Sequence, residues 1–108
     1  MTILYWKDLM LKSRIKENAL ARGIELKFAK NLEEIVALSK NSEHKRLIVD
    51  LSSGSEFAKS FKNLLSGFEQ SIGVIAHVDQ ETQKVALEVG FTSVIPRSVL
   101  VRDLEKLL

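Results

Sequence analysis

Residues 47–55 read LIVDLSSGS, and they indicate the class of fold more directly than any other part of the chain. Three apolar residues run without interruption up to Asp50. A strand with only apolar side chains is typical of a parallel sheet that helices cover on both faces, so this one is expected at the centre. The serine-rich stretch after it predicts a turn, and Ser53 or Ser55 is expected to cap a helix that runs to about Phe68.

The same alternation of apolar runs and segments of helical period extends over the whole chain. The run at 24–29 alternates apolar and charged residues, which predicts a half-exposed strand at the edge of the sheet. Five β–α units with right-handed connections predict an α/β fold, namely a three-layer, doubly wound open parallel sheet. The expected strands are residues 2–6, 24–29, 47–49, 72–77 and 92–95.

Capping residues indicate where several of the helices begin and end. Asn31 is followed three residues later by Glu34, the spacing of a capping box, so a helix is expected to begin there. Gly23 and Gly90 are expected to end the first and fourth helices, because a residue without Cβ enters the left-handed conformation at low cost. Ser98 is expected to cap the last helix.

Composition predicts a single domain that spans residues 1–108. A chain of 108 residues with 45% hydrophobic residues has room for one core and is too apolar to be disordered. Its net charge of +2 is too small to indicate a nucleic acid or an anionic membrane as partner. The chain has no cysteine and no signal-peptide pattern, so a cytoplasmic location is expected.

Ligands of doubly wound sheets gather at the carboxyl ends of the strands, and the residues there are the candidate functional residues. Trp6 is expected beside this cleft, where a partly exposed indole would mark a binding surface and a packed one would belong to the core. The sequence contains neither a nucleophile elbow nor a phosphate-binding glycine fingerprint, so no enzymatic activity is expected. The candidates are Lys7 and Asp8 after the first strand, Asp50 after the third, Ala76 and His77 at the fourth, and Arg97 after the fifth.

Two stretches match the pattern of a known family: LIVD at residues 47–50 and ALEVGF at residues 86–91. Together with the chain length and the order of the elements, they resemble the receiver domain of two-component response regulators over the whole chain. The resemblance implies a CheY-like, flavodoxin-like fold with strand order 2-1-3-4-5. It also implies that Asp50 stands at the phosphoacceptor position.

Departures from the family pattern bear on phosphorylation. Family receivers have two acidic residues after the first strand, where this chain has Lys7 and Asp8, and a hydroxyl after the fourth, where it has Ala76. Lysine in place of a carboxylate removes a Mg²⁺ ligand, so Asp8 and Asp50 are only weak candidates for a metal site. We expect the Lys7 ammonium to pair with Asp50 instead. Arg97 is expected to replace the family lysine as a cation that holds a carboxylate or phosphate.

These departures favour a stand-alone, degenerate receiver-like module that acts by protein–protein interaction, without a cofactor and without Mg²⁺-dependent phosphorylation of Asp50. The resemblance assigns its docking face to about residues 80–108. The last helix has more apolar residues than one buried stripe needs, so part of it is expected to meet a protein partner or a second copy in a homodimer. The expected interaction face comprises Val99, Leu100, Val101 and Leu104.

Two alternative functions remain open at this point. A phosphorylatable single-domain response regulator would use Asp50 with Mg²⁺, and a small-molecule or nucleotide-binding domain would have an apolar-lined pocket at the strand ends. Plainer interpretations of single residues also stand. In these, Asp50 is a capping carboxylate, and Lys7 and Arg97 are solvated cations. For His77 the plain interpretation is a solvated loop histidine, and the functional one is a donor to Asp50 or to an anion.

Overall fold

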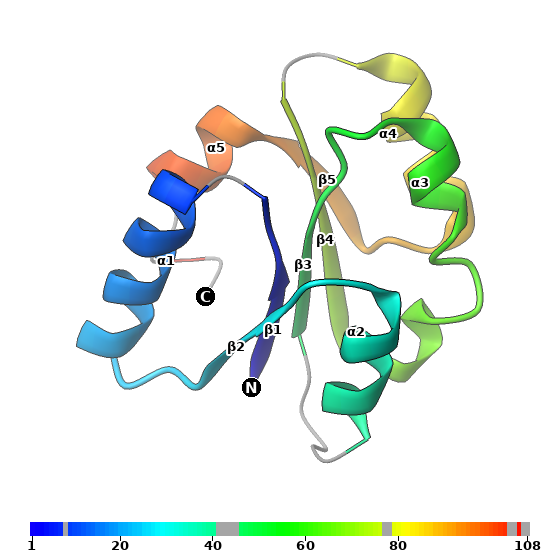
Figure 1. Ribbon diagram of the computed structural model, residues 1–108. Coiled ribbons are helices and arrows are strands. Elements are labelled where there is room, and N and C mark those ends of the chain that lie inside the picture. The colour runs from blue at the N-terminus through cyan, green and yellow to red at the C-terminus, as the bar shows by residue number, and fades with distance from the viewer. Residues whose placement is uncertain (8, 41–45, 77–78, 104–105, 107–108) are drawn as a thin grey trace.

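The computed structural model describes residues 1–7, 9–40, 46–76, 79–103 and 106, in which strands and helices alternate along the chain (Figure 1). The strands are β1 (Thr2–Tyr5), β2 (Leu26–Ala29), β3 (Arg46–Asp50), β4 (Gln70–Ile75) and β5 (Ser93–Pro96). The helices are α1 (Leu9–Ala21), α2 (Leu32–Ser39), α3 (Ser55–Lys59), α4 (Gln80–Val89) and α5 (Arg97–Arg102), and a 3₁₀ turn, η1, covers Leu65–Gly67. Across the described ranges, no helix has the length and apolar content of a transmembrane span.

The strands form one parallel sheet in the order β2-β1-β3-β4-β5, which confirms the predicted fold class and strand order. β3 is central, between β1 and β4, and Leu47, Ile48 and Val49 have no exposed surface. β2 lies at an edge, where exposed and half-buried residues alternate as predicted. The uninterrupted apolar run and the alternating run therefore occupy the positions that their patterns indicate.

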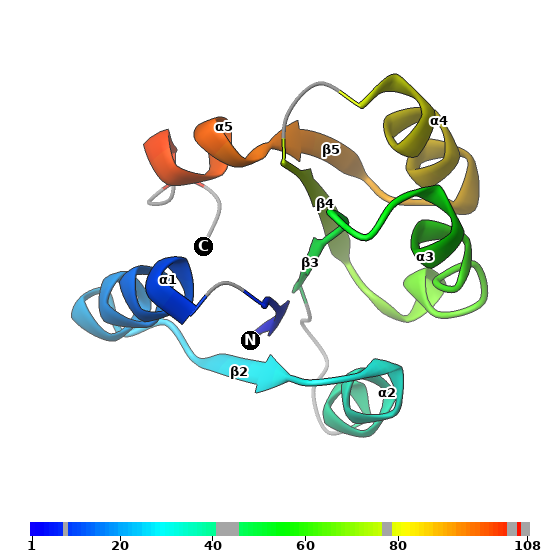
Figure 2. The same cartoon turned by 45° about the horizontal axis from the view of Figure 1, so that its top comes forward.

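Helices cover both faces of the sheet, and each face has its own buried core. Figure 2 shows α1 and α5 on one face and α2, α3 and α4 on the other. The core beneath α1 and α5 contains Leu4 and Leu100, whereas the core on the opposite face contains Ile3 and Phe61. Consecutive residues of β1 thus enter different cores, because side chains alternate across a strand.

The predicted caps of α2 and α4 are confirmed. Asn31 Oδ1 accepts a hydrogen bond from the Glu34 backbone N–H at 2.9 Å, and Glu34 Oε2 accepts one from the Lys30 N–H at 3.0 Å. Gly90 ends α4 with φ of 117°, a conformation that residues with a Cβ rarely adopt. The Asn31 cap thus marks the start of α2 at the carboxyl edge of the sheet, and Gly90 marks the end of α4 before β5 begins.

Three predicted helix caps or ends are wrong. Neither Ser53 nor Ser55 caps α3, because Gly54 is its N-cap and no side chain bonds to its first turn. The third helix does not run to Phe68, because α3 ends at Lys59 and gives way to turns with three-residue backbone spacing. The Ser60 hydroxyl donates to the Phe57 carbonyl, which is the kind of local competition that weakens a continuous helix.

The N-terminus of α5 also differs from the prediction that Ser98 caps it. The helix begins two residues earlier than a Ser98 cap implies, at Arg97, and Pro96 stands at its N-cap with φ of −71°. Proline holds φ close to this value and lacks an N–H, so it suits the junction between strand and helix.

Candidate functional site

Asp50 lies at the carboxyl end of the central strand, and its carboxylate is almost fully buried. The residue is 3% exposed, and its Cα pairs with Val74 of β4 in the parallel register. Its Oδ1 accepts a hydrogen bond from the Ser52 backbone N–H at 3.0 Å. This short-range bond is the capping interaction expected of an aspartate before a turn, and it satisfies one oxygen of the buried group.

Arg97 supplies a positive charge to the second oxygen of this carboxylate. Its Nη2 lies 3.9 Å from Asp50 Oδ2, and its side chain is 35% exposed. Its guanidinium carbon lies 5.7 Å from the centroid of the Trp6 ring, within the range of a cation–π contact. Arg97 therefore bridges a buried carboxylate and an aromatic face, and a planar guanidinium is well suited to both contacts.

The elements that hold these three residues come from the same edge of the sheet. Trp6 follows β1, Asp50 ends β3 and Arg97 follows β5. Because β4 lies between β3 and β5, the arginine reaches across the end of β4, where Ala76 stands exposed without a hydroxyl. The carboxyl ends of parallel strands thus bring together residues that are far apart in the sequence.

The predicted ion pair between Lys7 and Asp50 is wrong. Lys7 is exposed, and its Nζ donates a hydrogen bond to Ser53 Oγ at 3.1 Å. The structure describes both Lys7 and Asp50, and the ion pair of Asp50 is with Arg97. The physical reason is hydration: an ammonium on a flexible stem stays in water, whereas a guanidinium stacked on an aromatic ring tolerates partial burial.

Of the two placements open for Trp6, the structure shows the packed one, because it is 6% exposed and belongs to the core beneath α1 and α5. The Trp6 ring supports the Arg97 guanidinium, a contact that the sequence analysis did not predict. The signal was present: Trp6 and Arg97 both follow strands, and one ring face beside one guanidinium is a common pairing.

Several sequence candidates lie outside the described residues. These are Asp8, His77 and Leu104. Within the described ranges, no group of three His, Cys, Asp or Glu side chains is placed to hold a metal ion. The described part of the cleft has one carboxylate and two cations, Lys7 and Arg97, which does not fit the oxygen-rich ligand set that Mg²⁺ prefers.

The predicted interaction face on the last helix is wrong at Leu100. This residue has no exposed surface, because α5 turns it into the core beneath α1 and α5. Val101 is partly buried and packs against the same core, and Val99 is half-buried. The consecutive apolar residues of α5 are thus largely used within the domain.

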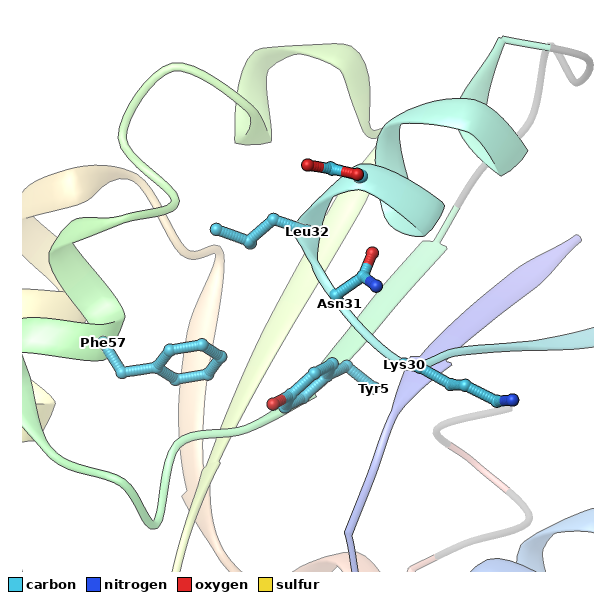
Figure 3. A pocket seen from close by; sticks show the side chains of 6 residues that line it. Tyr5, Lys30, Asn31, Leu32 and Phe57 are labelled. Carbon is cyan, nitrogen blue, oxygen red and sulfur yellow. The ribbon is translucent and has the colours of Figure 1, made fainter.

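A depression of about 390 Å³ opens at the carboxyl ends of β1 and β2. Figure 3 shows Leu32, Tyr5 and Phe57 gathered around it, with the Lys30 side chain directed away. The rings of Tyr5 and Phe57 are 5.3 Å apart between centroids. An apolar-lined depression at the strand ends is what the small-molecule alternative predicts. Its lining consists of Tyr5, Lys30, Asn31, Leu32, Glu33 and Phe57.

Comparison with known proteins identifies the fold through structure alone. No protein-family model matches the sequence, and no curated protein matches it either. Solved structures of response regulators match over nearly the whole chain, at low sequence identity. The chain therefore has the receiver-domain fold, as the resemblance implied.

Three of these structures illustrate the range of the similarity. A chemotaxis response regulator of Vibrio cholerae is 17% identical with a TM-score of 0.72, and the match covers 99% of this chain and 97% of that one. A chain from a co-crystal of a Saccharomyces cerevisiae histidine phosphotransfer protein with the receiver domain of its downstream response regulator is 21% identical, with a TM-score of 0.73 and coverage of 97% and 83%. An atypical orphan response regulator, described as having a phosphorylation-independent regulatory mechanism, is 18% identical with a TM-score of 0.69 and coverage of 97% and 92%.

Proposed function

Starting from the receiver-domain fold, we propose that this domain is a degenerate, receiver-like regulatory module that acts by binding another protein. In this proposal Asp50 is not switched by Mg²⁺-dependent phosphorylation. The domain catalyses no reaction, carries no cofactor and works in the cytoplasm. Protein partners are consistent with the receiver of known structure that was crystallised with a phosphotransfer protein.

The hydrogen bond from Lys7 to Ser53 carries the proposal, because it places an ammonium beside the loop that follows Asp50, where a receiver has a carboxylate that binds Mg²⁺. The contact between Arg97 and Asp50 adds a counter-ion at the position of the family lysine. Transfer of a phosphoryl group to a carboxylate brings two anions together, and Mg²⁺ normally screens them. Here Arg97 Nη2 lies 3.9 Å from Asp50 Oδ2, and Ser52 N–H donates to Oδ1. The buried carboxylate thus has a counter-ion and a donor from its own chain.

Lys7 and Ala76 support the same conclusion. Lys7 places an ammonium beside the loop that follows Asp50, through its hydrogen bond to Ser53, where a receiver would have a carboxylate. Ala76 has no hydroxyl to bond a phosphoryl group at the end of β4. Without that hydroxyl, arrival of a phosphoryl group would lack one of the contacts through which a receiver changes state.

The direct experiment is exposure of the protein to acetyl phosphate and Mg²⁺, followed by intact mass spectrometry. We expect the wild type and Asp50→Asn each to keep its own unmodified mass, while an ordinary receiver treated in parallel gains one phosphoryl group. A phosphoryl adduct on the wild type that Asp50→Asn abolishes would instead establish the phosphorylatable regulator. Arg97→Lys is a useful matched variant, because it keeps the positive charge and installs the lysine of the family pattern, and it should stay unmodified as well.

Binding of a small molecule is the second candidate function, and the depression at Tyr5, Leu32 and Phe57 favours it. Two aromatic rings and an aliphatic side chain suit a planar aromatic ligand. Thermal unfolding with a panel of aromatic compounds tests this candidate, since a ligand of the native state raises the midpoint. Phe57→Leu should cancel a genuine shift, and no shift with any compound would exclude the panel as ligands.

A further inference from the structure

The strand β2 directs a row of backbone hydrogen-bonding groups away from the sheet. It pairs with β1 alone among the described strands, and Figure 2 shows it as the outermost strand, between α1 and α2. The Thr2 N–H donates to the Glu25 carbonyl at 2.9 Å, and alternate residues of a strand direct their backbone groups to the same side. The N–H and carbonyl groups of Leu26 and Phe28 therefore face the open edge, where another strand could pair with them.

The side chains along this edge alternate between apolar and charged. Ile24, Leu26 and Phe28 are half-buried and pack against the core beneath α1 and α5, whereas Glu25 and Lys27 are exposed. Within the described ranges, neither Glu25 nor Lys27 forms an ion pair. Residues 24–29 contain no proline, the residue that would remove a donor from the edge. The edge thus has free backbone groups, one unpaired charge of each sign and no residue that blocks pairing.

Charge decides how two copies of this strand could pair. In an antiparallel pair related by a two-fold axis, outward-facing residues oppose each other, so the axis passes between one residue and its own copy. An axis at Glu25 or at Lys27 places identical charges directly opposite each other, which is destabilising. An axis at Phe28 brings two Phe28 rings together, each with a Lys12 Nζ 4.6 Å from its centroid, so two ammonium groups approach. These three registers are therefore unfavourable.

An axis at Leu26 places opposite charges against each other twice. Glu25 then lies opposite Lys27 of the second copy, and Lys27 lies opposite Glu25 of the second copy. Both are non-hydrogen-bonded pairs, in which the Cα atoms are only about 4.5 Å apart and the side chains are close. On the other face, Leu26 meets its own copy and Phe28 meets Ile24. The two Phe28 rings stay about 14 Å apart along the strands, at about 3.4 Å per residue, so the Lys12 groups do not meet.

We propose that two copies of this chain associate through their β2 strands, antiparallel and centred on Leu26, so that the two sheets join into one. A second copy is the occupant that the edge fits, because the strand complements its own charges in this register. The contact is two-fold, so it uses β2 of both copies and closes at the dimer. It lies at the opposite edge of the sheet from β5. The inference goes beyond the proposed function, because it involves neither Asp50 nor its counter-ion.

Sedimentation velocity of the full chain, from micromolar to near-millimolar concentration, tests the inference. The wild type should pass from monomer to dimer as the concentration rises. Lys27→Glu places a glutamate opposite Glu25 in both charged pairs, and we expect it to raise the dissociation constant of the dimer at least roughly tenfold. Lys84→Glu is the matched control and should leave the dissociation constant unchanged, because Lys84 is an exposed lysine of α4, which packs against β4 and β5.

Reciprocal variants test the register. Glu25→Lys alone places a lysine opposite Lys27 of the second copy, so it should weaken association as Lys27→Glu does. An equimolar mixture of these two variants should form heterodimers, because every charged pair across the edge is again of opposite sign. The double variant, Glu25→Lys with Lys27→Glu, should dimerise like the wild type for the same reason. Circular dichroism verifies that all variants keep the fold.

Amide hydrogen exchange measures whether the backbone edge itself is used. The amide protons of Leu26 and Phe28 face the open edge in the monomer and donate across it in the proposed dimer. At concentrations where the wild type is dimeric, these two protons should exchange at least roughly tenfold more slowly than in Lys27→Glu.

A wild type that stays monomeric at every concentration would overturn the inference and leave the edge to an extended segment of another protein. A dimer that Lys27→Glu leaves unchanged would also overturn it, because that dimer uses another surface. Failure of the mixed variants to associate would refute the register centred on Leu26. Equal exchange of the Leu26 and Phe28 amides in dimer and monomer would refute pairing through the backbone.

Discussion

Replacement of Arg97 by methionine should destabilise the protein by removing the positive charge from a buried carboxylate. Two unit charges 3.9 Å apart attract by about 4 kcal/mol at an effective dielectric constant of about 20. The side chain of Arg97 is 35% exposed, so solvent screens part of this attraction, and Ser52 still donates to Asp50 in the variant. We therefore expect the free energy of unfolding to fall by about 1–3 kcal/mol. Methionine keeps an apolar stem against Trp6, which limits the loss of packing.

A double-mutant cycle isolates the pairwise contribution from packing. Urea unfolding of the wild type, Arg97→Met, Asp50→Asn and the double variant is followed by fluorescence of Trp6, the single tryptophan of the chain. The coupling energy between Arg97 and Asp50 should be about 1–2 kcal/mol. The parallel cycle with Lys7→Met is the control, because Lys7 bonds to Ser53, and its coupling to Asp50 should stay within about 0.5 kcal/mol. A larger coupling for Lys7 than for Arg97 would refute this account of the cleft.

Three further predictions concern local structure and pH. Asn31→Ala should cost about 1 kcal/mol in urea unfolding, because it removes the hydrogen bond to the Glu34 N–H, and an unchanged midpoint would argue against that cap. Gly90→Ala should lower the free energy of unfolding by about 1–2 kcal/mol, since alanine is strained at φ of 117°. Gly67→Ala is the comparison, because no such strain applies at Gly67. Equal effects of the two substitutions would exclude a special role for the left-handed cap. The hydrogen bond from Arg102 lowers the pKa of Asp103. This pair therefore stabilises the fold above the ordinary pKa of aspartate, and it does so less as the pH falls through the lowered value. The NMR signal of the Asp103 carboxyl carbon should titrate below the usual range of aspartate, and Arg102→Gln should return its pKa to that range.

The fold was predictable because its main signals are local and redundant. The run before Asp50 has to be central, since an edge strand would leave Leu47 or Val49 in water. The alternating residues of β2 have to be at an edge, because a central strand would bury the charged residues among them. Gly90 and Asn31 fix helix ends through backbone geometry that depends on a few neighbouring residues. Such signals do not need knowledge of distant contacts.

The site was predictable in its location but not in its pairing. Topology alone brings Lys7, Asp50 and Arg97 to one edge of the sheet. Which cation meets the carboxylate depends on the Trp6 ring, which is buried and offers its face to a guanidinium, and sequence spacing does not encode that direction. Leu100 illustrates the same limit, because its apolar character fits both a core and an interface until the rotation of α5 is known.

The outer face of α1 shows what a periodicity argument overlooks. The spacing of Leu11, Ile15 and Ala19 at i, i+4 and i+8 predicts the buried stripe of this helix, and the structure shows all three buried. Leu9 and Leu20 fall outside that stripe, so they contributed nothing to the prediction of the core. That Leu9 and Leu20 are exposed can be recognised only once the packing of α1 on the sheet is known.

Titration with Mn²⁺, a paramagnetic substitute for Mg²⁺, tests the central claim most directly, with amide NMR signals around residue 50 as the readout. With Lys7 where a receiver has a Mg²⁺ ligand and Arg97 as the counter-ion of Asp50, we predict no saturable broadening of these signals in the wild type, and none in Asp50→Asn. Saturable broadening centred on Asp50 in the wild type, absent from Asp50→Asn, would contradict the account.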